Sequence, residues 1–327
     1  MLGLFAFWNT EKELKNKTHA CFLTGEKGEF KFMENYCLLT DAPADLSLPL
    51  AQELGIELIP MPLDIDGKPY LFTCFDDSLR MKTFYDLLRE GKFAHTSQIN
   101  ETIYMDQFKR HLENGEDILY LCFSSGLSNT YNAACLCVEQ LSRQYPDRRI
   151  VCIDTLCASS GEGLLAYTAA KKKQAGASLE EVRQWVERMR DHVCHCFKVE
   201  DLDHLRRGGR ISATTAVVGS ALQIKPILVV DHAGKLQNVA KMRGRKRAQE
   251  YQLSALERNL LPGAENDTLT IGHGDCQEEA EAMRDAILAR CPQIQHVIIL
   301  PVGAIIGTHV GPGMLTVNFY GKDKMCK

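Results

Sequence analysis

Three serines in one short stretch could together bind an anion. Ser124, Ser125 and Ser128 fall within residues 123–131, where a strand is predicted to end and a helix to begin. A helix start has unpaired N–H groups and a partial positive charge, and serine hydroxyls add donors. The stretch lacks the sequence patterns of a P-loop, a dinucleotide-binding loop and a hydrolase nucleophile elbow. An ordinary capped helix explains the pattern equally well.

Residues 96–98, Thr-Ser-Gln, form a second group of small polar side chains. They lie between two predicted helices and are therefore expected in a loop. Their hydroxyl and amide groups could bind a ligand, but Ser97 or Asn100 also suits the N-cap of the following helix. Taken alone, the pattern favours capping.

A histidine and an arginine lie in two further glycine-containing stretches. His309 belongs to residues 303–313, where four glycines indicate close backbone approaches or positive φ angles. Its imidazole could donate to a carboxylate or phosphate, or could be structural in a tight turn. Arg210 follows a predicted helical turn that ends at Gly208 and Gly209. Its guanidinium suits a carboxylate or phosphate, or the carbonyls at a helix end.

Two other stretches have simpler interpretations. Residues 191–196 contain two histidines and two cysteines. One of the histidines, His195, lies between Cys194 and Cys196. On a strand the two cysteines share a face and His195 points away, so strand packing is favoured over a metal site. The basic residues 241–247 suit a solvated helix start or a protein contact better than nucleic acid.

Composition limits the class of protein. The chain has 327 residues, of which 45% are hydrophobic and 24% charged, as in ordinary globular proteins. The net charge of −4 provides no general attraction to nucleic acid or anionic membranes. Thirteen scattered cysteines indicate a reducing compartment, so we expect a cytoplasmic protein. The apolar runs at residues 1–8 and 297–306 are too short to span a bilayer, and no stable membrane insertion is expected.

The first half of the chain alternates apolar runs with amphipathic segments. This alternation predicts a parallel sheet with helices on both faces, whose ligands bind beyond the carboxyl ends of the strands. Strands are predicted at residues 36–40, 56–63, 118–123 and 150–154, and helices at 47–54, 80–90, 103–113, 129–144 and 161–174.

The pattern changes near residue 190. We predict an N-terminal extension over residues 1–32, with Met33 as an alternative start, an N-terminal α/β domain over 33–190 and a C-terminal α/β domain over 191–327. Helices are predicted at residues 179–192, 245–259 and 278–290, and strands at 194–199, 227–230, 268–273, 296–300 and 315–319.

Taken in order, these stretches resemble the DegV family of bacterial fatty acid-binding proteins. Each match is short, but together they cover residues 36–320 in the family's order. The sequence departs from the family at Ala42, Ile99 and Asn129, where Ser, Pro and Gly are usual. The matching stretches are residues 40–46, 96–98, 124–131, 154–155, 160–163, 205–211, 219–228, 243–246 and 307–313.

The resemblance implies two α/β domains, the second with a mixed sheet, and one fatty acid in a tunnel between them. It implies a protein without catalytic residues or cofactor, which presents the fatty acid carboxylate to a fatty acid kinase of the dihydroxyacetone kinase type. The product would be an acyl phosphate for phospholipid synthesis. By resemblance, Arg210 serves the kinase step. The implied carboxylate-binding residues are Thr96, Ser125 and His309, with Ser97 and Ser124 adjacent.

Two other functions remain open on the residues alone. Ser125 and His309 could form the nucleophile and base of an acyl hydrolase. Alternatively, the protein could bind another anionic amphiphile or a phosphorylated metabolite. A co-purified acid of about 14 to 20 carbons would favour the fatty acid-binding interpretation.

Overall fold

The structure, a computed structural model, describes residues 21–23, 30–32, 34–73, 79–212, 223–263 and 266–326. Within the predicted extension it describes β1 (Cys21–Leu23) and β2 (Phe30–Phe32), which pair antiparallel. The rest of residues 1–32, Met33 and residues 219–222 lie outside the described residues. In the described ranges, no helix is both long enough and apolar enough to cross a membrane.

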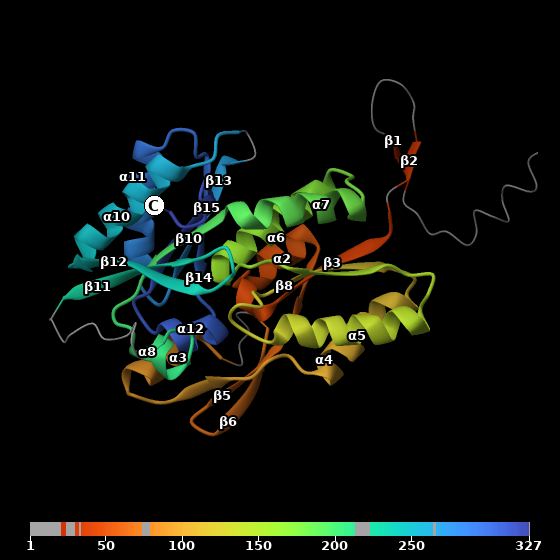
Figure 1. Ribbon diagram of the computed structural model, residues 1–327, viewed down its shortest axis with the longest axis horizontal. Helices are drawn as coiled ribbons and strands as arrows, with labels where there is room; N and C mark the ends of the chain where they lie inside the picture. Colours follow the sequence, from red (N-terminus) through yellow and green to blue (C-terminus); the bar gives the residue numbers. More distant parts are fainter. Residues whose placement is uncertain are drawn as a thin grey trace, which may run out of the picture.

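A four-stranded parallel sheet organises the first half of the chain (Figure 1). Alternate residues of one central strand point to opposite faces. Leu119 and Leu121 pack in one apolar core, and Ile118 and Tyr120 pack in another. Burial of both faces confirms the interpretation of the continuous apolar runs. In spatial order the strands are β4 (Ile56–Ile59), β3 (Tyr36–Asp41), β8 (Asp117–Cys122) and β9 (Ile150–Asp154).

Helices cover the two faces of this sheet. Leu164 and Val182 come from helices on the face of Leu119, and Phe108 and Ala134 come from helices on the face of Tyr120. The helices are α2 (Leu48–Leu54), α6 (Ser159–Gln174) and α7 (Leu179–Met189) on the first face, and α4 (Glu101–Glu113) and α5 (Thr130–Gln144) on the second.

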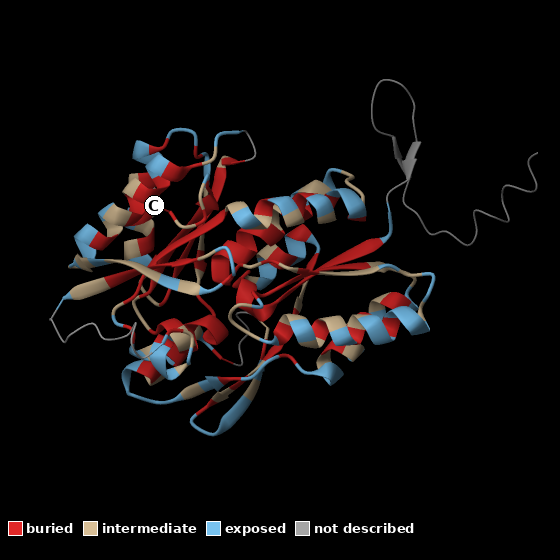
Figure 2. Ribbon diagram, in the orientation of Figure 1, coloured by how far each residue is buried: buried red, intermediate tan, exposed pale blue. Residues whose placement is uncertain are grey.

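A six-stranded mixed sheet forms the second half. The pair β13–β14 is parallel, and the other neighbouring pairs are antiparallel. Helices α10 (Arg245–Asn259) and α11 (Gln277–Arg290) pack against its strands, while α6 contacts β10, β13 and β15. Figure 2 shows the resulting buried interior along the strands of both sheets. The spatial order is β12 (Leu236–Arg243), β11 (Ile224–Val230), β10 (Val193–Lys198), β15 (Leu315–Tyr320), β13 (Thr268–His273) and β14 (His296–Pro301).

The predicted strand at residues 56–63 is wrong. The chain instead forms β4 and then β5 (Met61–Ile65), which belong to different sheets and are separated at Pro60. Proline lacks an N–H, so it cannot donate to a continuing ladder. Strand β5 pairs antiparallel with β6 (Lys68–Phe72) and β7 (Ala94–Thr96). Thr96, predicted in a loop, therefore ends a strand.

The sequence does not predict the short helix α12 (Ala304–Val310). Glycine disfavours helix interiors, and this segment contains Gly307. A Cβ atom on Gly307 would lie 2.7 Å from a ring carbon of Phe84 and 2.8 Å from the Tyr85 hydroxyl. The glycine thus allows α12 to pack closely on α3 (Met81–Arg89). The edge strand β12 is likewise unpredicted, because its residues are polar and only partly buried.

The connection between the two sheets runs through residues 190–192. Helix α7 ends at Met189, a 3-10 turn spans Arg190–His192, and β10 begins at Val193. The predicted domain boundary between residues 190 and 191 falls in this connection and stays a prediction.

Candidate ligand-binding site

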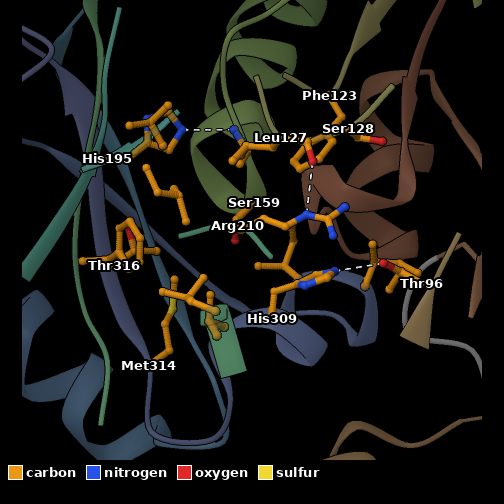
Figure 3. A pocket seen from close by; sticks show the side chains of 18 of the residues that line it. Thr96, Phe123, Leu127, Ser128, Ser159, His195, Arg210, His309, Met314 and Thr316 are labelled. Atoms are coloured by element: carbon orange, nitrogen blue, oxygen red, sulfur yellow. Dashed lines mark hydrogen bonds between the residues drawn. The ribbon is translucent and has the colours of Figure 1, made fainter. Parts of the chain in front are cut away.

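A narrow cavity lies between the parallel and mixed sheets (Figure 3). The centre of a water molecule could occupy about 60 Å³ of it. Most lining side chains are apolar: the first half of the chain contributes Met61, Phe123, Leu127 and Ala158, and the second half contributes Phe197, Leu205, Val230, Leu236, Ile305, Ile306, Val310 and Met314. Polar side chains lie at both sides of the view, with Thr96 and His309 on one side and His195 and Thr316 on the other.

Thr96 and His309 meet across the two halves of the chain. The Thr96 Oγ1 atom lies 2.8 Å from His309 Nε2. Strand β7 positions the threonine, because Thr96 pairs with Leu63 of β5, and α12 carries the histidine in its last turn. Helix α12 and strand β7 are in contact, so the side chains of Thr96 and His309 are held in fixed positions relative to each other.

The imidazole of His309 is neutral at physiological pH. Burial lowers its pKa to about 3, and the positive charge of Arg210 acts in the same direction. Its Nδ1 atom is buried and makes no hydrogen bond to any described residue. A Cβ atom on Gly208 would lie 2.2 Å from this nitrogen, so a glycine is needed where α8 (Asp203–Arg207) ends.

Arg210 reaches the cavity from the segment after α8. Its Nε donates to the Leu127 carbonyl at 3.2 Å and its Nη1 donates to the Gly208 carbonyl at 2.5 Å. Gly209, with a φ of 71°, provides the left-handed backbone that precedes it. Burial lowers the pKa of the guanidinium, which nevertheless stays charged. The hydrogen bond to Leu127 therefore joins the segment after α8 to the serine-rich loop.

The serine-rich loop does not place all its hydroxyls in the cavity. Ser124 is buried, and its Oγ donates to the Gly234 carbonyl at 2.8 Å and accepts from the Gly126 N–H at 3.1 Å. Ser125 is exposed, and its N–H donates to Asp154 at 3.1 Å. Ser128 lines the cavity instead. The structure thus holds the loop against the turn between β11 and β12 through Ser124.

The Thr-Ser-Gln stretch divides in a similar way. Ser97 is exposed, and its N–H donates to the Pro62 carbonyl at 3.1 Å. Asn100 caps α4, because its Oδ1 accepts from the Ile103 N–H at 3.0 Å. The capping prediction is therefore confirmed for Asn100.

The predicted site residues separate into two groups. Thr96, His309 and Arg210 line the cavity together, whereas Ser97, Ser124 and Ser125 are not among its lining residues. The head-group roles of the other five residues and the kinase-step role of Arg210 stay predictions. Ala42 is buried in the apolar core that also contains residues of the parallel sheet, α3 and α4, and Asn129 has a φ of −81°, outside the left-handed region.

Sequence reasoning did not identify the polar residues on the other side of the cavity. His195 points into it while Cys194 and Cys196 pack in the core beneath α10, as the strand alternation predicted. His195 Nε2 accepts from the Ala158 N–H at 3.2 Å, and burial lowers the pKa of this histidine to about 3. In the sequence, the alternation of His195 with two cysteines was the only indication that its side chain faces away from the core that holds them. Among the described residues, no group of three or more histidine, cysteine, aspartate or glutamate side chains could hold a metal ion.

Ser159 connects the cavity wall to a buried carboxyl group. Its hydroxyl donates to Asp45 Oδ2 at 2.5 Å, and Asp45 Oδ1 accepts from the Gly303 N–H at 2.9 Å. Burial raises the pKa of Asp45 to about 7, although both hydrogen bonds oppose the shift. Asp45 thus joins the loop after β3 to the start of α12, the helix that carries His309.

The cavity does not show the arrangement of a serine hydrolase. His309 Nε2 contacts Thr96, and Ser125 lies outside the cavity lining. A nucleophile requires a base within hydrogen-bond reach. The geometry instead combines a narrow apolar space with a few polar groups from separate segments, as is usual in a site for an amphipathic ligand.

Known proteins are similar to this chain in sequence and fold. Residues 36–322 match the family described as "Uncharacterised protein, DegV family". A DegV domain-containing protein of Clostridium perfringens is 41% identical over 292 residues, which cover 89% of this chain and 99% of that protein.

Two solved structures show what such proteins bind. A DegV family protein from Thermus thermophilus, described as fatty acid-binding, is 28% identical with a TM-score of 0.77, covering 88% of this chain and 99% of that one. A DegV family protein from Ruminococcus gnavus, solved with vaccenic acid, is 25% identical with a TM-score of 0.77, covering 86% and 99%. The family match and the coverage show that this chain belongs to the DegV family.

Proposed function

We propose that this protein binds one long-chain fatty acid in the cavity between its two sheets and presents the carboxylate to a fatty acid kinase. The observation that carries the proposal is the narrow apolar cavity with Thr96, His309 and Arg210 gathered on one side. The fatty acid-binding relatives of similar fold support it.

The apolar walls account for affinity. Each buried methylene contributes about 0.8 kcal/mol, so fourteen of them supply about 11 kcal/mol before the costs of association. Phe123, Phe197, Ile306 and Met314 offer the required surface. The tail would therefore hold the ligand, and the polar groups would fix which end emerges.

The Thr96–His309 pair suits the carboxylate end. If Nε2 carries the histidine proton, it donates to Thr96 Oγ1, and the buried Nδ1 beside Gly208 keeps only a lone pair. The threonine O–H is then free to donate to a carboxylate. Arg210, with no carboxylate partner among the described residues, adds a positive charge nearby. Such donors offset the cost of burying an anion.

The kinase step follows from the head-group position. A carboxylate held by Thr96 and His309 at one side of the cavity could be phosphorylated by a separate kinase of the dihydroxyacetone kinase type, in the cytoplasm. The acyl phosphate would then serve phospholipid synthesis. This chain supplies the substrate and no catalytic residue.

Native mass spectrometry after mild purification tests the binding proposal. We expect one co-purified acid of about 14 to 20 carbons per chain. A phosphorylated metabolite or another amphiphile in its place would contradict the proposal. Turnover of acyl esters by the purified protein would instead support the hydrolase.

Variants test the head-group assignment. Thr96→Val and His309→Ala remove the donors, so each should lower phosphorylation of bound palmitate by a cognate kinase about tenfold or more, while the tail still binds. Thr102→Val, an exposed threonine on α4, is the matched control. Unchanged phosphorylation in both site variants would contradict the assigned roles.

A further inference from the structure

Two partly exposed cysteines meet where helix α5 covers the edge of the parallel sheet. Strand β9 pairs only with β8 among the described residues and therefore forms that edge. Cys152 of β9 pairs with Tyr120 of β8, so the two side chains point to the same face of the sheet. Helix α5 covers this face and contacts β9 (Figure 1). Cys135 lies in the second turn of α5, where its thiol meets that of Cys152.

Other cysteines of the chain are less suited to reaction. The described cysteines are all free, and among them only Cys135, Cys152 and Cys276 are partly exposed. The Cys276 Sγ donates to the Met314 carbonyl at 3.2 Å, and burial raises the pKa of this thiol to about 12. Cys276 is therefore protonated and unreactive at neutral pH. Cys135 and Cys152 instead combine partial exposure with a neighbouring thiol.

The surroundings of Cys135 stabilise its thiolate. The Cys152 thiol and, to a smaller extent, the Tyr131 hydroxyl interact with the Cys135 sulfur and lower its pKa to about 6. Burial and the negative charge of Asp154 oppose this shift. Burial also raises the pKa of Cys152, so Cys152 stays protonated and can donate to the thiolate. Cys135 is thus the nucleophile of the pair, and Cys152 is a thiol within its reach.

No role described above uses these two thiols. Neither Cys135 nor Cys152 lines the acyl cavity. The Cys152 thiol also interacts with Cys122, but Cys122 is buried in the core on the α5 face of the sheet. A thiolate at the surface with a second thiol behind it is the arrangement found in cysteines that oxidise reversibly.

We propose that Cys135 and Cys152 form a peroxide-sensitive thiol pair. The Cys135 thiolate attacks one peroxide oxygen, the O–O bond breaks, and a sulfenic acid and hydroxide form. The Cys152 thiol then attacks the Cys135 sulfur, the S–O bond breaks, and the thiol proton leaves with the hydroxyl group as water. The two sulfur atoms are oxidised to a disulfide, and the peroxide is reduced to water and hydroxide.

The disulfide would bridge the two elements that flank the serine-rich loop. Helix α5 begins at Thr130, just after Ser128 of the acyl cavity. Strand β9 ends at Asp154, whose carboxylate accepts from the Ser125 N–H at 3.1 Å. Oxidation would therefore fix both ends of this loop to each other. The inference does not depend on the ligand, so it stands whether or not the chain binds a fatty acid.

Peptide mass spectrometry of the full chain tests the pair. The reduced protein is treated with hydrogen peroxide, its remaining thiols are alkylated, and its peptides are sequenced by fragmentation. We expect a disulfide between Cys135 and Cys152 that dithiothreitol reverses. Cys135→Ser should abolish it, whereas Cys137→Ser, at a buried position on the same helix, should leave it intact. A disulfide that joins Cys152 to Cys122 instead, or no disulfide at Cys152, would overturn the proposal.

Alkylation rates test the thiolate independently. Cys135 should react with iodoacetamide at pH 7 at least tenfold faster than Cys276, because the thiolate is the reactive form. Cys152→Ala removes the neighbouring donor and should slow the reaction of Cys135 several-fold at pH 6 but little at pH 9. Cys152→Ser keeps a hydroxyl donor and should preserve the rate, although both variants lack the disulfide.

Two results of the rate measurements would contradict the pairing. One is equal alkylation rates for Cys135 and Cys276, and the other is equal effects of Cys152→Ala and Cys152→Ser at pH 6. Melting temperatures of the reduced variants show whether each one folds.

Discussion

Asp45 shows how one buried residue can make the stability of the fold depend on pH. Its carboxyl group accepts hydrogen bonds from Ser159 and Gly303, and burial raises its pKa from an ordinary value of 3.8 to about 7. A raised pKa means that the folded state holds the proton more tightly than the unfolded state. Its contribution to stability is therefore fully present below about pH 4 and is lost as the pH rises to about 7.

Asp45→Asn should remove this dependence, because an amide keeps a neutral side chain of the same shape. The difference in unfolding free energy between wild type and variant should fall by at most about 4 kcal/mol between pH 4 and pH 7. Urea unfolding at several pH values measures it. Asp106→Asn, at an exposed carboxylate on α4, is the control. A difference between wild type and Asp45→Asn that does not vary with pH would show that Asp45 ionises normally in the fold.

At the scale of the element, α12 depends on close packing that local helix preference opposes. Gly307→Ala should favour an isolated helix by about 1 kcal/mol. In the protein its new methyl group would meet the Phe84 ring and the Tyr85 hydroxyl, at 2.7 Å and 2.8 Å from the Cβ position. We expect a net loss of about 1 to 3 kcal/mol in stability, measured by chemical denaturation.

The double variant Gly307→Ala with Phe84→Leu tests that cause. Removing the ring should relieve part of the overlap, so the two changes together should cost less than the sum of their separate costs. Additive costs would mean that Phe84 is not the obstacle to a side chain at Gly307.

The same elements show how far the sequence predicts the fold. Helix ends followed from local signals, such as Ser47 and Gly55 at the ends of α2, and strand alternation correctly predicted that His195 points away from Cys194 and Cys196. Helix α12 could not be predicted, because its glycine makes sense only beside α3. Strand β7 is only three residues long and is defined by its partner β5.

The sequence also predicted only part of the candidate site. The family motifs predicted Thr96, His309 and Arg210, which the structure brings to one cavity. Ser128 lines the cavity although Ser125, in the same motif, is exposed. The contacts of Ser124 with the distant Gly234 decide how this loop turns, and such long-range contacts are not visible in a single sequence.

At the scale of the whole molecule, the cavity draws its walls from both halves of the chain, so a ligand there should stabilise the chain as a unit. Ala158 and Phe123 come from the first half, and Phe197 and Met314 from the second. At a free concentration of 100 times its Kd, a ligand adds about 2.7 kcal/mol to the stability of the folded state. Palmitate should therefore raise the melting temperature of the delipidated protein by several degrees.

Chain length separates the contribution of the tail from that of the head group. Octanoate has the same carboxylate as palmitate but eight fewer methylenes, which corresponds to a loss of about 6 kcal/mol in binding free energy. At the same free concentration octanoate should leave the melting temperature unchanged, and saturated acids of intermediate length should raise it progressively. Differential scanning fluorimetry measures the series, with hexadecane-1,2-diol as an uncharged control for the tail. Equal stabilisation by octanoate and palmitate would show that the polar residues dominate binding and that the apolar cavity is not the acyl site.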